Sequence, residues 1–199
     1  MLVVPERARI AVAGEQAKRP VWRTILLNKP RGVVTTRRDP EGRRTVFDVL
    51  GDEAKGLVAV GRLDLASSGL LLLTTDTQLA NRLTDPGSAL VRRYLVTVRG
   101  AMSDADAARM TSGIDGLRAH SAVVRKRSAR ETHLIVELVE GKNREIRRLC
   151  GGVGHEVTAL KRVAFGRLEL GDLAPGAWRP VSREEAGRAF GAAAQPRRR

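Results

Sequence analysis

The hydrophobic residues of this chain recur with two periods, one typical of strands and one typical of helices. Residues 57–60 and 70–73 are short apolar runs bounded by glycine and polar residues, a pattern that favours buried strands. Residues 91–99 alternate between apolar and polar positions, as in a strand with one exposed face. Further strands are expected at residues 22–27, 121–127, 132–139, 155–163 and 167–170.

Helices are predicted by apolar residues three and four positions apart and by capping residues. Residues 76–83, which Asp76 can cap, and residues 146–153 have this spacing. Thr45, Ser103 and Ser182 can begin three further helices, and Ser182 opens a Ser-x-x-Glu capping box. The periodicity therefore indicates a mixed α and β protein.

The two ends of the chain differ in composition from its middle. Residues 1–20 are polar and weakly patterned, residues 21–190 carry the regular patterns, and residues 191–199 form a basic tail that we expect to be disordered. The 199 residues, 42% of them hydrophobic, suffice for one sizeable domain or two small ones. No apolar run is long enough to span a bilayer, and residues 1–14 lack the apolar core of a signal peptide.

The charge of the chain is strongly basic. Lys and Arg number 36 against 22 Asp and Glu, which gives a net charge of +14 and a pI near 11.3. A solvated basic surface is the simplest explanation, but arginine binds phosphate bidentately, and this charge favours a nucleic-acid partner. Aromatic residues are only 3% of the chain, which argues against a base-stacking sheet or OB-fold.

Cysteine and metal-ligand patterns exclude several classes of site. The single cysteine, Cys150, allows neither a disulfide framework nor a cysteine-rich zinc site, and favours a reducing compartment. It lies on the apolar side of its predicted helix, so we interpret it as a core residue rather than a nucleophile. The sequence contains no Walker loop, dinucleotide-binding glycine motif or zinc-ligand pair.

Three stretches contain residues suited to chemistry. Residues 61–69, Gly-Arg-Leu-Asp-Leu-Ala-Ser-Ser-Gly, form a loop between two predicted strands, and their single carboxylate, Asp64, is either a turn residue or a functional group on a loop held by the scaffold. Residues 93–96, Arg-Tyr-Leu-Val, contain the only tyrosine, Tyr94, which could be an ordinary strand aromatic. Residues 140–150, Glu-Gly-Lys-Asn-Arg-Glu-Ile-Arg-Arg-Leu-Cys, place three arginines beside an apolar stripe.

Together these stretches, with the Ser-Gly-Leu-Leu-Leu-Leu-Thr run that continues the first, resemble the motifs of the RsuA-like family of ribosomal RNA pseudouridine synthases. The resemblance covers residues 25–185. It implies an α+β fold in which a mixed, largely antiparallel sheet has flanking helices and a central active-site cleft. It also implies that a specific uridine of ribosomal RNA is isomerised to pseudouridine. Residues 5–14 resemble the last strand of an N-terminal RNA-binding module, so residues 1–20 are a remnant of it or a linker, the module being truncated or naturally absent.

The resemblance assigns three residues to the chemistry. Asp64 is the catalytic carboxylate, Tyr94 stacks on the target base, and Arg147 pairs with Asp64. We expect Asp64 and Arg147 to be in contact within a cleft that screens the carboxylate from water, because a cation there keeps the carboxylate ionised. The sequence leaves open whether Asp64 attacks the sugar or the base, or removes the 2′ proton.

The resemblance also assigns residues to RNA binding. Arg62 helps to extrude the uridine and Ile146 lines the base pocket, and the remaining members of the set are Lys142, Asn143, Arg144, Arg148, Lys161 and Arg162. Lys29 lies in an Asn-Lys-Pro stretch that the family shares, and we interpret it as part of a structural turn. We expect ribosomal RNA as the partner, no metal or cofactor, and a monomeric cytoplasmic protein.

Two positions depart from the family pattern, and one alternative function stays open. Ser67 replaces the usual threonine, and Glu145 replaces the usual glutamine, which adds a carboxylate beside a basic cluster. Residues 125–127 form a basic strand edge that either contacts RNA or keeps the edge soluble. The alternative is a non-catalytic RNA-binding or ribosome-assembly protein on the same scaffold, and a plain basic structural protein comes third. The presence of all three catalytic-motif residues, Asp64, Tyr94 and Arg147, disfavours the non-catalytic alternative.

Overall fold

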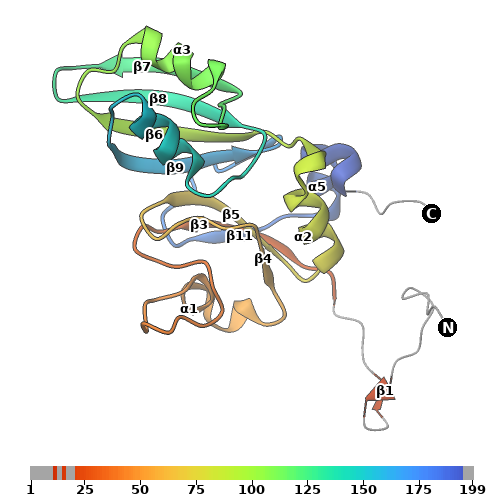
Figure 1. Ribbon diagram of the computed structural model, residues 1–199. Helices are drawn as coiled ribbons and strands as arrows, with labels where there is room; N and C mark the ends of the chain where they lie inside the picture. The colour runs from red at the N-terminus through yellow and green to blue at the C-terminus, as the bar shows by residue number, and fades with distance from the viewer. Residues whose placement is uncertain (1–10, 13–14, 17–20, 195–199) are drawn as a thin grey trace.

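The computed structural model describes residues 11–12, 15–16 and 21–194 of the chain. Its centre is a nine-stranded sheet (Figure 1). Seven of the strands follow the order β11 (Trp178–Pro180), β3 (Thr24–Lys29), β5 (Ser68–Thr74), β9 (Val157–Phe165), β6 (Arg92–Arg99), β8 (Glu131–Leu138) and β7 (Ser121–Arg127). Two short strands join at the sides, β4 (Val58–Val60) on β5 and β10 (Leu168–Glu169) on β9, while β1 (Ala11–Val12) and β2 (Glu15–Gln16) form a separate pair.

The sheet consists of two antiparallel halves joined by one short parallel contact. In Figure 1 the upper half contains β7, β8, β6 and β9, and the lower half contains β5, β3, β11 and β4. Strands β5 and β9 meet in parallel at only two positions, Ser68 opposite Lys161 and Gly69 opposite Arg162. The mixed, largely antiparallel sheet expected from the resemblance is therefore confirmed.

The junction depends on a glycine. Gly69 has a φ of +101°, and a Cβ added there would lie 2.1 Å from the main-chain oxygen of Arg162. No side chain fits at that distance, so glycine lets the two backbones approach closely enough for the halves to join. The same contact brings the start of β5, directly after the loop that carries Asp64, against β9.

Five α-helices and three short 3-10 helices flank the sheet in the described residues. They are α1 (Val46–Leu50), η1 (Gly51–Ala54), α2 (Thr77–Thr84), η2 (Pro86–Ser88), α3 (Asp104–Ser112), α4 (Glu145–Gly152), α5 (Arg183–Phe190) and η3 (Gly191–Ala194). In Figure 1, α3 lies over the upper half of the sheet, α1 lies in the lower half, and α2 and α5 lie together on the right. The side chains of Thr45, Asp76, Ser103 and Ser182 cap four of the helices as expected.

Two hydrophobic cores lie on the two faces of the central strands. On β5, Leu71 and Leu73 belong to the core that contains α1, α3 and α4, whereas Leu70 and Leu72 belong to the core that contains α2 and α5. The leucine run is thus buried on both faces, which explains why it shows no alternation. No helix within the described residues is long and apolar enough to cross a membrane.

Two local expectations are corrected at the C-terminal end. The hydroxyl of Ser182 caps α5, but the Glu185 carboxylate does not complete the capping box, because it pairs with Arg179 at 2.7 Å. The tail expected to be disordered from Gly191 begins as η3, where the Ala193 carbonyl accepts a hydrogen bond from Arg82 Nε at 3.1 Å. The rest of that tail, and the side chains of residues 1–20, lie outside what the structure describes.

Candidate active site

A cavity of about 750 Å³ opens where the two halves of the sheet and the two cores meet. Nine of the eleven residues assigned to a site by sequence line it: Arg62, Asp64, Tyr94, Lys142, Asn143, Arg144, Ile146, Arg147 and Arg162. The two others, Arg148 and Lys161, do not line it. Residues separated by about a hundred positions in sequence therefore share one concave site, as a ligand site requires.

The Asp64 loop is fixed through its main chain. The carbonyl of Leu63 accepts a hydrogen bond from the Thr35 hydroxyl at 2.9 Å, and that of Leu65 accepts one from the amide of Gly32 at 2.8 Å. A turn inside the loop adds a hydrogen bond from the amide of Ser67 to the carbonyl of Asp64 at 3.0 Å. Because the contacts engage main-chain oxygens, the backbone that carries Asp64 is preorganised while the carboxylate faces the cavity.

Two cations complete this support. Lys29 Nζ donates to the carbonyl of Ser67 at 2.8 Å, and Arg147 Nη2 donates to the carbonyl of Ala66 at 3.4 Å. Arg147 also donates from Nη1 to the carbonyl of Val157 at 3.0 Å, so one side chain links α4, β9 and the loop. Burial and the neighbouring arginines lower the pKa of Arg147, and Asp64 opposes that shift.

The arrangement of Asp64 and Arg147 differs from the expectation in one respect. Both residues line the same cavity, but the hydrogen bonds of the Arg147 guanidinium go to main-chain oxygens rather than to the Asp64 carboxylate. Asp64 is exposed rather than screened from solvent. The interaction between the two side chains is therefore electrostatic across the cavity, and the carboxylate remains available to a ligand.

Lys29 is the residue whose place the sequence did not reveal. It ends β3, its side chain is completely buried, and it donates to the carbonyls of both Pro30 and Ser67. Burial lowers its pKa to about 8, and the nearby Asp64 carboxylate acts in the opposite direction. Interpreting Lys29 as only part of a turn was therefore incomplete. The signal available was a lysine shortly after the apolar run Ile25–Leu27 and directly before a proline.

Tyr94 lies on the floor of the cavity. It is 8% exposed and is paired with Val136 on β8 and with Arg162 on β9. Side chains directly opposite each other in an antiparallel pair point to the same face, so the ring and the Arg162 guanidinium are neighbours. Ile146, near the start of α4, lines the same cavity.

Glu145 is buried at the first position of α4. It is 4% exposed, and its Oε2 accepts a hydrogen bond from the amide of Lys142 at 3.1 Å. Burial raises the pKa of this carboxyl, and the hydrogen bond from Lys142 opposes the rise. This carboxylate, at a position where the resemblance implied a glutamine, therefore holds the preceding loop, at the cost of burying a charge.

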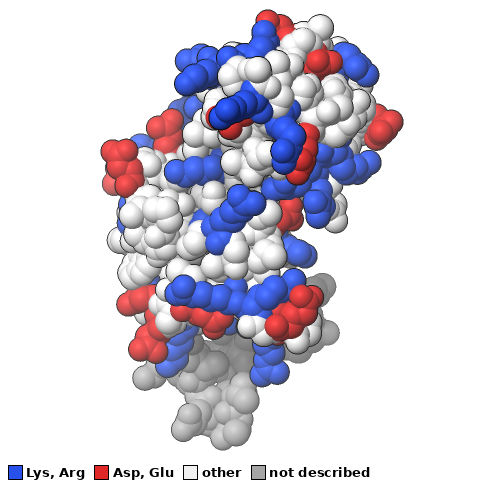
Figure 2. Space-filling model, turned by 90° about the vertical axis from the view of Figure 1, so that its left-hand side faces the viewer, with Lys and Arg blue, Asp and Glu red and all other residues white. Residues whose placement is uncertain are grey.

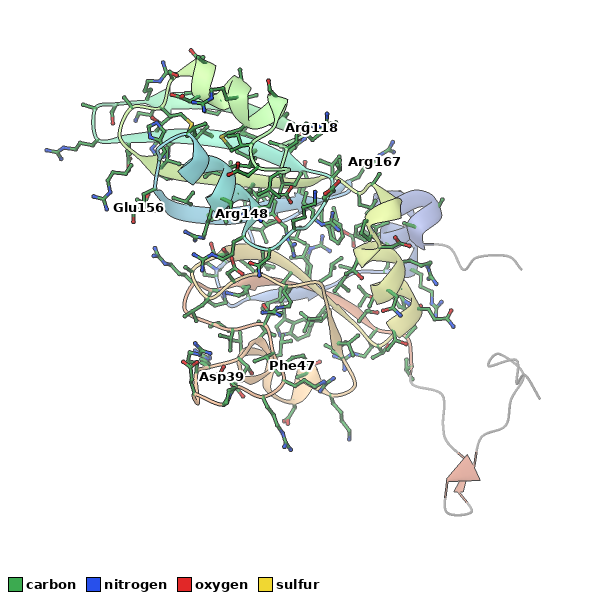
Figure 3. The ribbon with its side chains drawn as sticks, in the orientation of Figure 1. Asp39, Phe47, Arg118, Arg148, Glu156 and Arg167 are labelled. Atoms are coloured by element: carbon green, nitrogen blue, oxygen red, sulfur yellow. The ribbon has the colours of Figure 1, made fainter. Side chains whose placement is uncertain are left out.

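The remaining predicted residues lie outside the cavity. Arg148 is exposed on α4 in the upper half of Figure 3. Lys161 lies on β9, opposite Ser68 of β5 and Leu95 of β6. Arg127, at the outer edge strand β7, pairs with Asp104 of α3 at 2.8 Å, far from the site in the strand order. Cys150 is fully buried and burial raises its pKa to about 12, which confirms that it is a core residue.

A second cavity, of about 490 Å³, adjoins the first and extends over the loop after β3. It shares Arg62, Asp64, Arg144 and Arg147 with the first cavity, and Arg38 and Arg43 line its other side. On the face shown in Figure 2, Lys and Arg side chains extend from the top to the lower part of the molecule. The surroundings of Asp64 are thus strongly basic.

Comparison with known proteins places this geometry in a family. The model of the RNA pseudouridylate synthase family matches residues 23–151. An Aquifex aeolicus protein named an uncharacterized RNA pseudouridine synthase is 36% identical over 193 residues, which cover 94% of this chain and 78% of that protein. The ribosomal large subunit pseudouridine synthase B of Pseudomonas aeruginosa is 41% identical over 180 residues, which cover 86% of this chain and 46% of that protein. The chain thus spans about half the length of that large-subunit relative.

Solved structures agree with the sequence relatives. A crystal structure of a pseudouridylate synthase superposes with a TM-score of 0.72 at 27% identity, covering 83% of this chain and 72% of the other. The archaeal box H/ACA Nop10–Cbf5 complex contains a chain with the same fold, at a TM-score of 0.55 and 18% identity over 74% of this chain and 48% of the other. The extent of the family match and the Aquifex relative show that this chain belongs to the RNA pseudouridylate synthase family.

Proposed function

We propose that the chain isomerises a specific uridine of ribosomal RNA to pseudouridine, with Asp64 as its catalytic carboxylate. The observation that carries the proposal is the position of Asp64, an accessible carboxylate on a loop whose main chain is held from three sides. Tyr94 and Ile146 provide an apolar floor and wall for a base. The names of the relatives support large-subunit RNA as the substrate.

The reaction makes few demands on the protein. The bond from N1 to the ribose carbon breaks, the base turns, and a bond from C5 to the same carbon forms, while the C5 proton is lost and N1 gains one. Asp64 initiates this change by attacking the sugar or base or by removing the 2′ proton, and each route needs the ionised carboxylate. Lys29 and Arg147 place two cationic side chains near Asp64, and neither forms a hydrogen bond with its carboxylate.

The target uridine must leave its stack before it can reach the cavity. Unstacking costs a few kcal/mol, which contacts to the extruded base offset. Arg62 is exposed where the two cavities meet, which places it between an entering base and the RNA outside. Arg38 and Arg144 then bind phosphates along the second cavity. We expect the protein to act as a monomer in the cytoplasm.

The test compares pseudouridine maps of ribosomal RNA from cells with and without the gene. One position should lose its pseudouridine in the deletion, regain it with the wild-type gene and remain unmodified with Asp64→Asn. The variant removes the charge but little volume, so its purified form should bind the same RNA within a few fold of the wild type. Identical maps with and without the gene would refute the activity. Full modification by Asp64→Asn would refute the role of Asp64 alone.

A further inference from the structure

One buried side chain of the cavity has hydrogen-bonding capacity that the protein does not use. Arg162 is 3% exposed, and its Nε donates to the carbonyl of Leu70 at 2.7 Å. Its Nη2 is buried and has no hydrogen-bond partner, alone in this respect among the side-chain atoms that the structure describes. A buried donor without an acceptor is costly, so such a group in a cavity indicates a ligand that supplies the acceptor.

The fold holds this guanidinium in one orientation. A bulge in the pairing of β6 with β9 places Tyr94 opposite Arg162 and leaves Val163 without a partner on β6. Bulges near active sites commonly redirect a side chain. The guanidinium also lies 5.6 Å from the centre of the Phe165 ring, so the Leu70 carbonyl and this ring fix two sides of it.

The neighbouring Arg92 shows that burial alone does not leave an arginine without partners. Its side chain is 8% exposed and also lies over Phe165, at 4.8 Å. Its guanidinium nevertheless donates to three main-chain carbonyls, those of Leu83, Leu90 and Val139. Arg92 is therefore explained as a structural residue, whereas Arg162 is not.

We propose that Arg162 donates a hydrogen bond to the 4-carbonyl of the target uracil and so selects uracil over cytosine. This inference rests on the proposed function and names the residue that recognises its base. Leu138, Ile146 and Leu160 line the same cavity as Arg162, and this apolar part of the lining suits a flat base better than a hydrated backbone phosphate. Cytosine has an amino donor at the same position, and two donors facing each other cannot form the bond.

The chemistry of the reaction agrees with this placement. In uracil, C4 lies across the ring from N1, the atom bonded to the sugar. After isomerisation the sugar is bonded to C5, and C2 lies across the ring from that atom. Because C4 and C2 both carry a carbonyl, one donor deep in the cavity can hold the substrate and, after the base turns, the product.

The experiment uses the full chain and an RNA fragment that contains the uridine found by the mapping described above. A second fragment carries 4-thiouridine at that single position, because sulfur is a weaker acceptor than oxygen. The wild type should convert the uridine fragment roughly 10- to 100-fold faster, as expected for a hydrogen bond from a charged donor. Arg162→Met should convert both fragments slowly and at nearly equal rates, whereas the control Arg148→Met should keep the wild-type ratio.

Three results would overturn the inference. The first is equal conversion of the two fragments by the wild type, a comparison that needs no variant and so survives a folding defect of Arg162→Met. The second is an Arg162→Met protein that keeps the wild-type ratio. The third is an Arg162→Met protein that binds both fragments equally weakly and whose slope of log affinity against log salt concentration is smaller than that of the wild type by about one, which would identify a phosphate contact. A wild type that converts neither fragment would instead refute the proposed function, and this inference with it.

Discussion

Replacing Gly69 by alanine should separate the two halves of the sheet and disable the site. The change adds one methyl group at the point where β5 and β9 meet. That methyl would lie 2.1 Å, 2.8 Å and 3.0 Å from the main-chain oxygen, nitrogen and carbon of Arg162. All three atoms belong to the backbone of a central strand, so no flexible side chain can move out of the way.

The magnitude follows from two separate effects. A side chain at φ +101° costs roughly 1–2 kcal/mol because its Cβ crowds its own backbone. Relief of the 2.1 Å contact requires β9 to withdraw by about 1 Å, and overpacking of this kind costs roughly 1–3 kcal/mol. Together they give a loss of roughly 2–5 kcal/mol, a large part of the 5–15 kcal/mol that stabilises a typical domain.

Urea unfolding followed by circular dichroism measures this loss, with Gly100→Ala as the matched control. Gly100 also has a positive φ, +78°, but an added Cβ would meet nothing within 4 Å. The control should therefore lose only the roughly 1–2 kcal/mol of backbone strain. If Gly69→Ala is no less stable than Gly100→Ala, the close approach of β5 and β9 does not require glycine and the reasoning fails. Where Gly69→Ala still folds, its displaced Arg162 should also reduce pseudouridine formation.

Three further outcomes are expected. Lys29 has a pKa of about 8 when folded and near 10.5 when unfolded, so the unfolding free energy of the wild type relative to Lys29→Met should rise by up to roughly 3 kcal/mol between pH 8 and 10.5 in urea titrations. A difference in unfolding free energy that does not change with pH would contradict a buried, titrating amine. Glu145→Gln should stabilise the protein at pH 7, since burial raises the pKa of that carboxyl, and thermal melts should show this gain in stability vanish as the pH falls toward 4.5. A gain in stability that is the same at every pH would point to packing instead. Arg147→Ala should slow single-turnover pseudouridine formation on the order of 100-fold and Arg148→Ala only a few fold, because Arg147 holds the carbonyl of Ala66 while Arg148 lies outside the cavity. Similar losses of rate in the two variants would refute the role assigned to Arg147.

Local sequence determined most of the secondary structure. The caps at Thr45, Asp76 and Ser103 and the alternation along β6 follow from short-range hydrogen bonding and burial, so the sequence predicted these elements to within a few residues. The three motif stretches also resembled those of RNA pseudouridine synthases, and the family match confirms that resemblance. The capping box at Ser182 is incomplete because Arg179, on another element, pairs with the Glu185 carboxylate, although the Ser182 hydroxyl still caps α5.

Tertiary structure alone decided how the site is built. Nothing in the leucine run of β5 shows that it joins β9 in parallel through two residue pairs. Parallel strands are joined by long connections, so their pairing depends on how segments distant in sequence pack together. The same limit applies to Lys29 and Arg162, whose side chains appear in sequence as ordinary basic residues. Only the packed fold shows that one is fully buried beneath the Asp64 loop and that the other holds an unpartnered donor in the cavity. The burial and the hydrogen-bond partners of these two side chains depend on segments tens of residues away in sequence, so local composition and spacing do not reveal them.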